Sequence, residues 1–226
     1  MQEPVEIVER RTATDVVFER LYEEIVSLKL MPGTKLSEQE IARRFGVSRQ
    51  PVRDAFNRLG NLDLLLIRPQ KATEVRGFSM PRIEHARFVR LAVELEVLRD
   101  ACSVWTESHA EALERIIDRQ QQVIDRGQPE KFHELDYRFH RLICELGGHP
   151  LAFETIEDCK RKIDRLCVLS LGRAQEAATL VEDHRRIAHA LRRRSAEEAT
   201  AAARLHLGRL DETIADIHRT HSEYFE

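Results

Sequence analysis

The stretch PGTKLSEQEIARRFGVSRQPVRDAFNRL, residues 32–59, decides the fold of the N-terminal third of this 226-residue chain. It contains two short helical segments separated by Gly46, a residue type that readily takes the left-handed conformation at a helix end. A capping box over residues 37–40 predicts the start of the first helix. Ser48 predicts the start of the second, where Pro51 is tolerated because backbone N–H groups of a first turn have no intrahelical partner. The stretch therefore predicts a helix-turn-helix.

The second of these helices has an apolar face and a polar face. The apolar residues follow the i, i+3, i+4, i+7 spacing of a buried stripe and are Val52, Ala55, Phe56 and Leu59. The opposite face carries Arg49, Gln50 and Arg53, and such side chains near a helix start suit guanine and adenine edges in the major groove. Ser48, with the first free N–H groups, suits a phosphate. We therefore predict DNA contacts from these four residues and from Arg43 in the preceding helix.

The alternative is an ordinary helical hairpin whose arginines are only solvated. Two observations favour DNA binding. Between Arg43 and Arg58 there are five arginines and one acidic residue. A β-wing is predicted to follow, with short strands over 64–68 and 73–76, and the turn between them carries Lys71 towards a second phosphate or the minor groove.

Several short motifs in this segment match one known pattern. They are Pro32-Gly33, Leu36-Ser37-Glu38, Gly46-Val47-Ser48-Arg49, Pro51-Val52-Arg53-Asp54-Ala55 and Arg58-Leu59. With these motifs the segment resembles the winged helix-turn-helix of the GntR family of bacterial transcription regulators. Two positions depart from the family pattern, because Asp63 precedes the first wing strand and Ala72 lies at the wing tip where the family usually has glycine.

The positive charge of the chain is local. Residues 1–78 carry 13 basic and 12 acidic side chains, the remainder carries 23 and 27, and the formal net charge is −3. This balance excludes a protein that coats DNA through charge alone and favours a site-specific reader. The chain shows no secretory segment after Met1 and no apolar run that could span a bilayer, so a cytoplasmic protein is predicted. Its four cysteines form no C-x-x-C pair, which predicts free thiols.

From Arg82 onward the sequence shows helical periodicity without strand-like alternation. We expect a mostly α fold in which a winged helix-turn-helix with a small β-wing, residues 1–78, is followed by an all-α helical bundle, residues 79–226. The first domain should begin with a helix over 15–28, and residues 77–81 should link the two domains. The helices predicted in the bundle span 82–105, 107–126, 129–146, 150–171, 175–194 and 196–222.

Polar residues interrupt the apolar stripes of three of these helices. Asp136 and His140 are four residues apart and therefore point the same way from successive turns. His184 and His206 each occupy a position within the apolar stripe of their own helix. Imidazole and carboxylate groups together suit zinc, nickel, cobalt or manganese. The alternative to a metal site is that the histidines are hydrogen-bonded core residues. If there is a metal site, His133, three residues before Asp136, is a competing ligand.

The second domain resembles the FCD effector domain of FadR-like members of the GntR family. In that domain an aspartate-x-x-x-histidine on one helix and two histidines on the last two helices bind a metal. The residues that the resemblance assigns as metal ligands are Asp136, His140, His184 and His206. Arg90 matches a family arginine that can meet an anionic effector, and the alternative for it is an exposed or Glu94-paired arginine.

The sequence thus predicts a DNA-binding transcription regulator that is controlled by a small carboxylate-bearing metabolite at a divalent metal site. The resemblance implies a homodimer, which would present two recognition helices to palindromic double-stranded operator DNA. One alternative is a metalloenzyme that uses the Asp-His-His-His site. Glu182 and Asp183 beside His184 keep that alternative open, although no placed acid, base or nucleophile stands out. The other alternative is a metal-free interaction protein with structural histidines.

Overall fold

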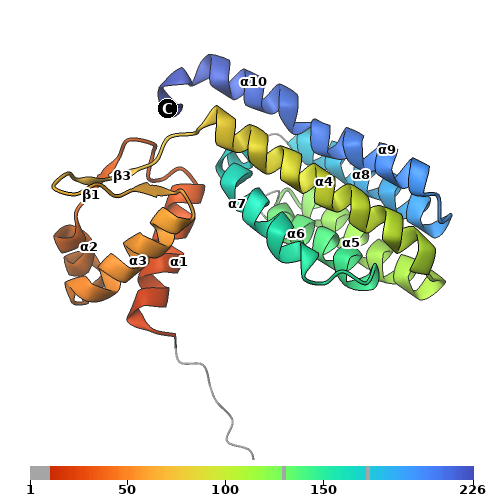
Figure 1. Ribbon diagram of the computed structural model, residues 1–226, viewed down its shortest axis with the longest axis horizontal. Helices are drawn as coiled ribbons and strands as arrows, with labels where there is room; N and C mark the ends of the chain where they lie inside the picture. Colours follow the sequence, from red (N-terminus) through yellow and green to blue (C-terminus); the bar gives the residue numbers. More distant parts are fainter. Residues whose placement is uncertain (1–10, 129–130, 172–173) are drawn as a thin grey trace, which may run out of the picture. The chain divides into compact units, whose positions relative to one another are not determined.

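A computed structural model describes residues 11–128, 131–171 and 174–226, apart from the side chains of 164, 167–171 and 174–176, and the chain divides into two compact units after Gly77 (Figure 1). The first unit comprises α1 (Ala13–Val26), β1 (Lys35–Leu36), α2 (Glu38–Phe45), α3 (Arg49–Asn61), β2 (Leu65–Leu66) and β3 (Thr73–Val75). The second comprises α4 (Met80–Val104), α5 (Glu107–Asp125), α6 (Phe132–Leu146), α7 (Ala152–Leu171), α8 (Ala174–Arg192), α9 (Ala196–Gly208), α10 (Leu210–Thr220) and the 3-10 turn η2 (Ser222–Tyr224).

The predicted fold class is confirmed, with a winged helix-turn-helix followed by a helical domain. The sheet of the first unit has the order β1-β3-β2, and both pairs are antiparallel. Strand β1 was not predicted, because two residues are too short to show an alternating pattern. Among the described helices, none combines the length and the apolar content needed to cross a membrane.

The helix-turn-helix is held by an apolar core between α1 and α3. The buried apolar side chains of these two helices are Val17, Leu21, Ile25, Val52, Ala55, Phe56 and Leu59. Gly46 ends α2 in the left-handed conformation, with φ of 65°. The predicted capping bonds at Ser37 and Ser48 are wrong, because neither side chain accepts a hydrogen bond from its helix. The capping box of this unit lies instead before α1, between Thr12 and Asp15.

The wing forms although both expected glycines are missing. Asp63 takes the left-handed conformation with φ of 58°, which aspartate tolerates better than most residues. Arg76 Nη1 donates a hydrogen bond to Asp63 Oδ1 at 3.0 Å and so holds the residue. In the turn before Ala72 the left-handed position is taken by Gln70, with φ of 59°. The turn therefore needs no glycine at Ala72.

The second unit is a bundle in which α4 packs against α7 and α9, and α8 packs against α5 and α9. Helix α4 begins at Met80, earlier than predicted, because Pro81 is accommodated in its first turn. The C-terminal residues close on the start of this unit, since Phe78 N donates to Tyr224 O at 2.7 Å and Glu226 N donates to Phe78 O at 2.9 Å. The described cysteines, Cys102, Cys144 and Cys159, are free and buried, and the side chain of Cys167 lies outside the described ones.

The prediction of one final helix over 196–222 is wrong, because α9 ends at Gly208 and α10 starts at Leu210. Glycine has the lowest helix propensity after proline, which favours a break at this point. Arg209 lies at the junction, where its Nε and Nη2 donate to the two carboxylate oxygens of Asp183 at 2.7 and 3.1 Å. This ion pair fixes the junction beside α8, the helix that carries His184.

Candidate metal centre and DNA-reading surface

Four side chains of the second unit converge in its interior. Asp136 and His140 come from α6, His184 from α8 and His206 from α9, and one ligand atom of each lies within 4.8 Å of the others. All four are buried, and His184 is fully enclosed with its ring stacked on Phe139 at 3.9 Å between centroids. Residues from three helices that are up to 70 positions apart in the chain are therefore placed as a single donor cluster.

Two of the imidazole rings are oriented by neighbours outside the cluster. Gln120 Nε2 donates to Leu135 O at 3.2 Å, so its Oε1 faces His184 Nδ1 at 2.8 Å. Because an amide oxygen only accepts, His184 carries its proton on Nδ1 and turns the lone pair of Nε2 into the cluster. Glu94 Oε2 lies 2.8 Å from His140 Nδ1 and orients that ring in the same way. Such outer partners are typical of metal-binding histidines.

Sequence reasoning missed Gln120. The signal was present, because Gln120 continues the stripe of Leu113 and Ile117 as the one polar member of an apolar line. His133, the competing ligand, does not join the cluster and packs edge-on against Tyr137 with centroids 5.0 Å apart.

Burial and neighbouring charges set the protonation of the cluster. Within the described part of the chain, His184 Nε2 and His206 Nδ1 have no hydrogen-bond partner. Burial lowers the pKa of both rings, for His206 well below its ordinary value, so they are neutral. Burial alone would raise the pKa of Asp136, but Lys160 and His140 hold it well below its ordinary value. Neutral imidazole nitrogens and a carboxylate are the forms that bind a divalent ion, so the donors fit the predicted metals.

Two cationic side chains adjoin the cluster. Arg90 is buried, its Nε donates to Glu94 Oε1 at 2.6 Å, and its Nη2 lies 3.2 Å from His140 Nε2. The Glu94-paired alternative for Arg90 therefore holds, and the same guanidinium also lies at the site. The second cation, Lys160 of α7, was missed by sequence reasoning and contacts Asp136 Oδ2.

The first unit presents its polar side chains on the outer face of α3. Arg49, Gln50 and Arg53 are exposed, as predicted for a face that meets DNA. Glu38 at the start of α2 accepts hydrogen bonds from Arg49 Nη2 at 3.0 Å and from Arg53 Nε at 3.1 Å. The hydrogen bond from Arg53 is the main reason that the pKa of Glu38 is lowered. Glu38 thus holds both guanidinium groups on one side of the helix.

Not every arginine of this segment faces outward for DNA. Arg44 Nη1 donates to Glu24 Oε2 at 2.9 Å, and Arg58 Nη1 donates to Asp15 Oδ1 at 2.8 Å. Both pairs tie the helix-turn-helix to α1, so the count of five arginines overstates the charge available to DNA. The other predicted contacts, Arg43, Ser48 and Lys71, are exposed.

Comparisons with known proteins agree with both halves of this description. Residues 13–75 match the family described as bacterial regulatory proteins, gntR family, and residues 86–209 match the FCD domain. The chain belongs to the GntR family. It is 36% identical over 209 residues to the HTH-type transcriptional repressor RspR of Escherichia coli K12, a match that covers 92% of each chain. It is 31% identical to an HTH-type transcriptional regulator of Streptomyces ambofaciens over 94% of this chain and 89% of the relative.

These relatives are regulators, so this GntR-family chain is a DNA-binding transcription regulator and not an enzyme, as predicted. The metalloenzyme alternative is thereby set aside. The solved structure of Escherichia coli McbR/YncC shares the fold, with a TM-score of 0.72, 20% identity, and coverage of 93% of this chain and 99% of that one.

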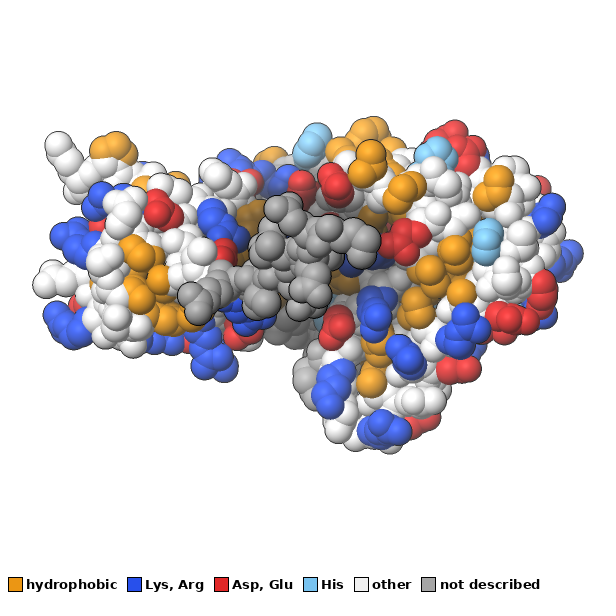
Figure 2. Space-filling model, turned by 90° about the horizontal axis from the view of Figure 1, so that it is seen from below, with side chains coloured by type: hydrophobic (Ala, Val, Ile, Leu, Met, Phe, Trp, Pro, Cys, Tyr) orange, Lys and Arg blue, Asp and Glu red, His pale blue; other side chains and the backbone are white. Residues whose placement is uncertain are grey.

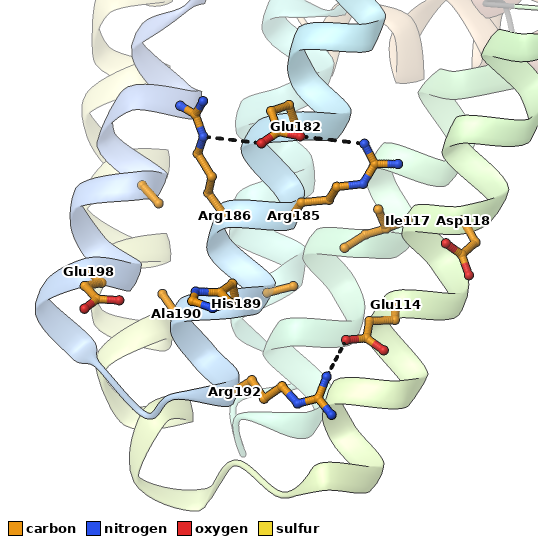
Figure 3. Close-up of a pocket in the computed structure, with 12 residues that line it drawn as sticks. Glu114, Ile117, Asp118, Glu182, Arg185, Arg186, His189, Ala190, Arg192 and Glu198 are labelled. Carbon is orange, nitrogen blue, oxygen red and sulfur yellow. Dashed lines mark hydrogen bonds and ion pairs between the residues drawn. The ribbon is translucent and has the colours of Figure 1, made fainter.

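The FCD unit also has a surface groove of about 640 Å³ between α5, α8 and α9 (Figure 3). Its lining includes none of the four converging residues. Figure 3 shows Arg185 and Arg186 directed at Glu182, and Arg192 at Glu114, so each of these arginines is paired with a carboxylate of the groove. Figure 2 likewise shows acidic, basic and apolar side chains interspersed over the visible face of this unit. We read the groove as solvated surface, and His189 within it is a suitable control for the buried histidines.

Replacing Gln120 by Leu is expected to destabilise the regulator by about 1–3 kcal/mol, because His184 Nδ1 would lose its partner in a buried place and the Leu135 carbonyl would lose an additional hydrogen bond. The measurement is urea denaturation in the presence of a chelator. Gln121→Leu, on the half-buried neighbour that bonds Asp125 and Arg185, is the matched control and should change stability by less than about 0.5 kcal/mol. Equal decreases in unfolding free energy in the two variants would contradict the role of Gln120 as the partner that orients His184.

Proposed function

We propose that this GntR-family regulator binds palindromic operator DNA as a homodimer in the cytoplasm and responds to a small carboxylate-bearing metabolite at a metal site in its FCD domain. The observation that supports the metal site best is the pair of buried nitrogens, His184 Nε2 and His206 Nδ1, that have no hydrogen-bond partner in the described chain. The former lies 3.4 Å from Asp136 Oδ1, itself a proposed ligand atom. Leaving two such atoms unpaired costs free energy in a purely structural cluster. A metal ion would satisfy both.

The proposed ligands are Asp136, His140, His184 and His206, and the donor set suits zinc, nickel, cobalt or manganese. Four protein ligands leave positions on a five- or six-coordinate ion that an effector carboxylate can fill. Glu94 and Gln120 fix the rings of His140 and His184, so these two ligands are oriented before an ion arrives.

Arg90 is the proposed anchor for the effector anion. Its guanidinium lies 3.2 Å from His140 Nε2, the nitrogen that also lies 3.6 Å from Asp136 Oδ1. A ligand that favours a rearranged state shifts the population of conformations, which is the requirement for control of DNA binding.

The proposed DNA contacts are Ser48, Arg49, Gln50 and Arg53 at the start of α3, with Arg43 of α2 and Lys71 of the wing. In a homodimer two such helices would enter successive major grooves, and the dimer would set the half-site spacing. RspR is named a repressor, and we extend that direction of control to this chain.

Replacing Arg53 by Ala should weaken binding to the specific operator by about 1–3 kcal/mol and relax the base preference at one position, because a base-edge contact is lost. Replacing Lys71 by Ala should weaken binding to all sequences about equally, as expected for a phosphate contact. Both are measured by titrating labelled DNA of operator and scrambled sequence at one salt concentration.

Glu38 complicates the first measurement, because it engages Arg49 and Arg53 in the absence of DNA. The double variant Glu38→Gln with Arg53→Ala removes this competition and serves as the control. If Arg53→Ala binds operator like wild type in both backgrounds, α3 does not read bases through this residue.

Replacing His184 or His206 by Ala should reduce bound divalent metal far below one ion per chain, because each removes one of four ligands. Elemental analysis of purified protein after dialysis against zinc gives the stoichiometry. His189→Ala, on the same helix α8 but exposed in the groove, should leave the metal content unchanged. Equal metal content in His184→Ala and His189→Ala would remove the basis for the site.

Removing the metal should abolish the influence of a carboxylate effector on operator affinity while residual DNA binding remains, because Arg49 and Arg53 belong to the first unit. Couplings of this kind typically amount to ~1–3 kcal/mol, so operator affinity should change roughly 5- to 150-fold with effector. Calorimetric titration of di- and hydroxycarboxylates, with and without operator, compares wild type with Asp136→Ala. An effector that acts equally on metal-free Asp136→Ala contradicts the proposal.

A further inference from the structure

Lys160 is a buried lysine whose position calls for an explanation. Only 4% of the residue is exposed, its ammonium contacts Asp136 Oδ2, and Nζ lies 4.5 Å above the ring of Tyr137. Lysine is almost never fully buried unless it is paired. Its partner here is one of the four proposed metal ligands, and Lys160 contacts Oδ2 of that carboxylate while Oδ1 faces His140 and His184.

The charges around the cluster are balanced before any ion is added. Glu94 and Asp136 supply two negative charges, and Arg90 and Lys160 supply two positive charges that contact them. The nearby Asp183, 4.0 Å from His206 Nδ1, is matched in the same way by Arg209.

A divalent ion at this place would add two positive charges to a buried group of side chains whose charges already cancel. Uncompensated charge in a protein interior is costly, so the full complex needs two negative charges from elsewhere. The ion would take Asp136 Oδ1, the oxygen that faces His140 and His184, while Lys160 contacts Oδ2. The charge of the carboxylate is then shared between the ion and Lys160, so the ammonium has charge and N–H donors left for another anion.

We propose that Lys160 is the resident counter-ion of Asp136, and that with the metal bound its ammonium, together with Arg90, receives a small effector that carries two acidic groups. The proposal rests on the proposed metal and effector function, and it narrows the effector to a dianion such as a dicarboxylate. One acidic group meets the metal and Arg90, and the second meets Lys160. Lys160 therefore opposes metal binding and selects the effector.

These two roles predict opposite effects of one substitution. Lys160→Met replaces the side chain by an unbranched one that is shorter by one atom and uncharged, so zinc affinity should rise on the order of tenfold. The same variant should lose the preference for a dianion over a monoanion of equal size. A lysine with a merely structural role would, when replaced, weaken zinc and ligand binding together.

The experiment uses the full chain and has two arms. Zinc affinity is measured by competition with a chromophoric chelator for wild type, Lys160→Met and the control Lys162→Met on the same helix. Zinc-loaded protein is then titrated by calorimetry with malonate, succinate and glutarate and with the half-amide of each. Lys160→Arg, which keeps the charge, should retain the preference for the dianions if Lys160→Met folds poorly.

Tighter zinc binding in Lys160→Met alone, with loss of the preference for dianions, supports the proposal. Unchanged or weaker zinc binding in Lys160→Met overturns the counter-ion role, and wild-type protein that fails to prefer the dianions overturns the ligand class. Wild-type protein that binds no zinc overturns the proposed function itself, and this inference with it. Zinc binding that is equal in wild type and Lys160→Met overturns this inference alone.

Discussion

The carboxylate of Asp136 lies inside a helical bundle, and the arrangement of the FCD unit around it follows from the need to stabilise that charge. An unpaired carboxylate in an apolar interior would be destabilising by several kcal/mol or would take up a proton. Lys160 and His140 contact this carboxylate, and their charges and hydrogen bonds hold the pKa of Asp136 well below its ordinary value. Helices α6 and α7 are therefore joined at this point by a charge pair as well as by apolar packing.

Much of the fold followed from local patterns, because those patterns have local causes. Gly46 ends α2 since glycine is unstrained in the left-handed conformation, and the stripe from Val52 to Leu59 is buried since its spacing gives α3 one apolar face. Glycine at 208 favours a break, but the position of the junction after it and the pairing of β1 with β3 depend on tertiary contacts. Arg209 is held by Asp183 from another helix, and β1 exists only because β3 lies beside it. Neither contact can be seen in a sequence window.

In the candidate site too, features with a local cause could be predicted and features that depend on tertiary contacts could not. The four-residue spacing of Asp136 and His140 and the interrupted stripes at His184 and His206 were visible in the sequence, and the structure brings these side chains together. Gln120 and Lys160 also interrupt apolar stripes, but a polar residue at a buried position does not reveal its partner. The bond of Gln120 to His184 spans 64 positions and that of Lys160 to Asp136 spans 24. At Ser37 and Ser48 the sequence motif was right about the helix start but wrong about the capping bond, since helix initiation does not require that bond.

The contacts within the FCD unit run from the cluster to its first residues. His206 lies near the end of α9, and the next residues, Gly208 and Arg209, form the junction that Asp183 holds beside His184. Helix α10 follows, and the residues after it bond to Phe78, which comes directly after Gly77. Such adjacency does not by itself demonstrate coupling, which needs an element with two arrangements that both sites bias. His206 and the residues that bond to Phe78 nevertheless belong to one continuous segment, because only the short helix α10 and the turns beside it separate them, so α10 is the element whose two arrangements such coupling would need.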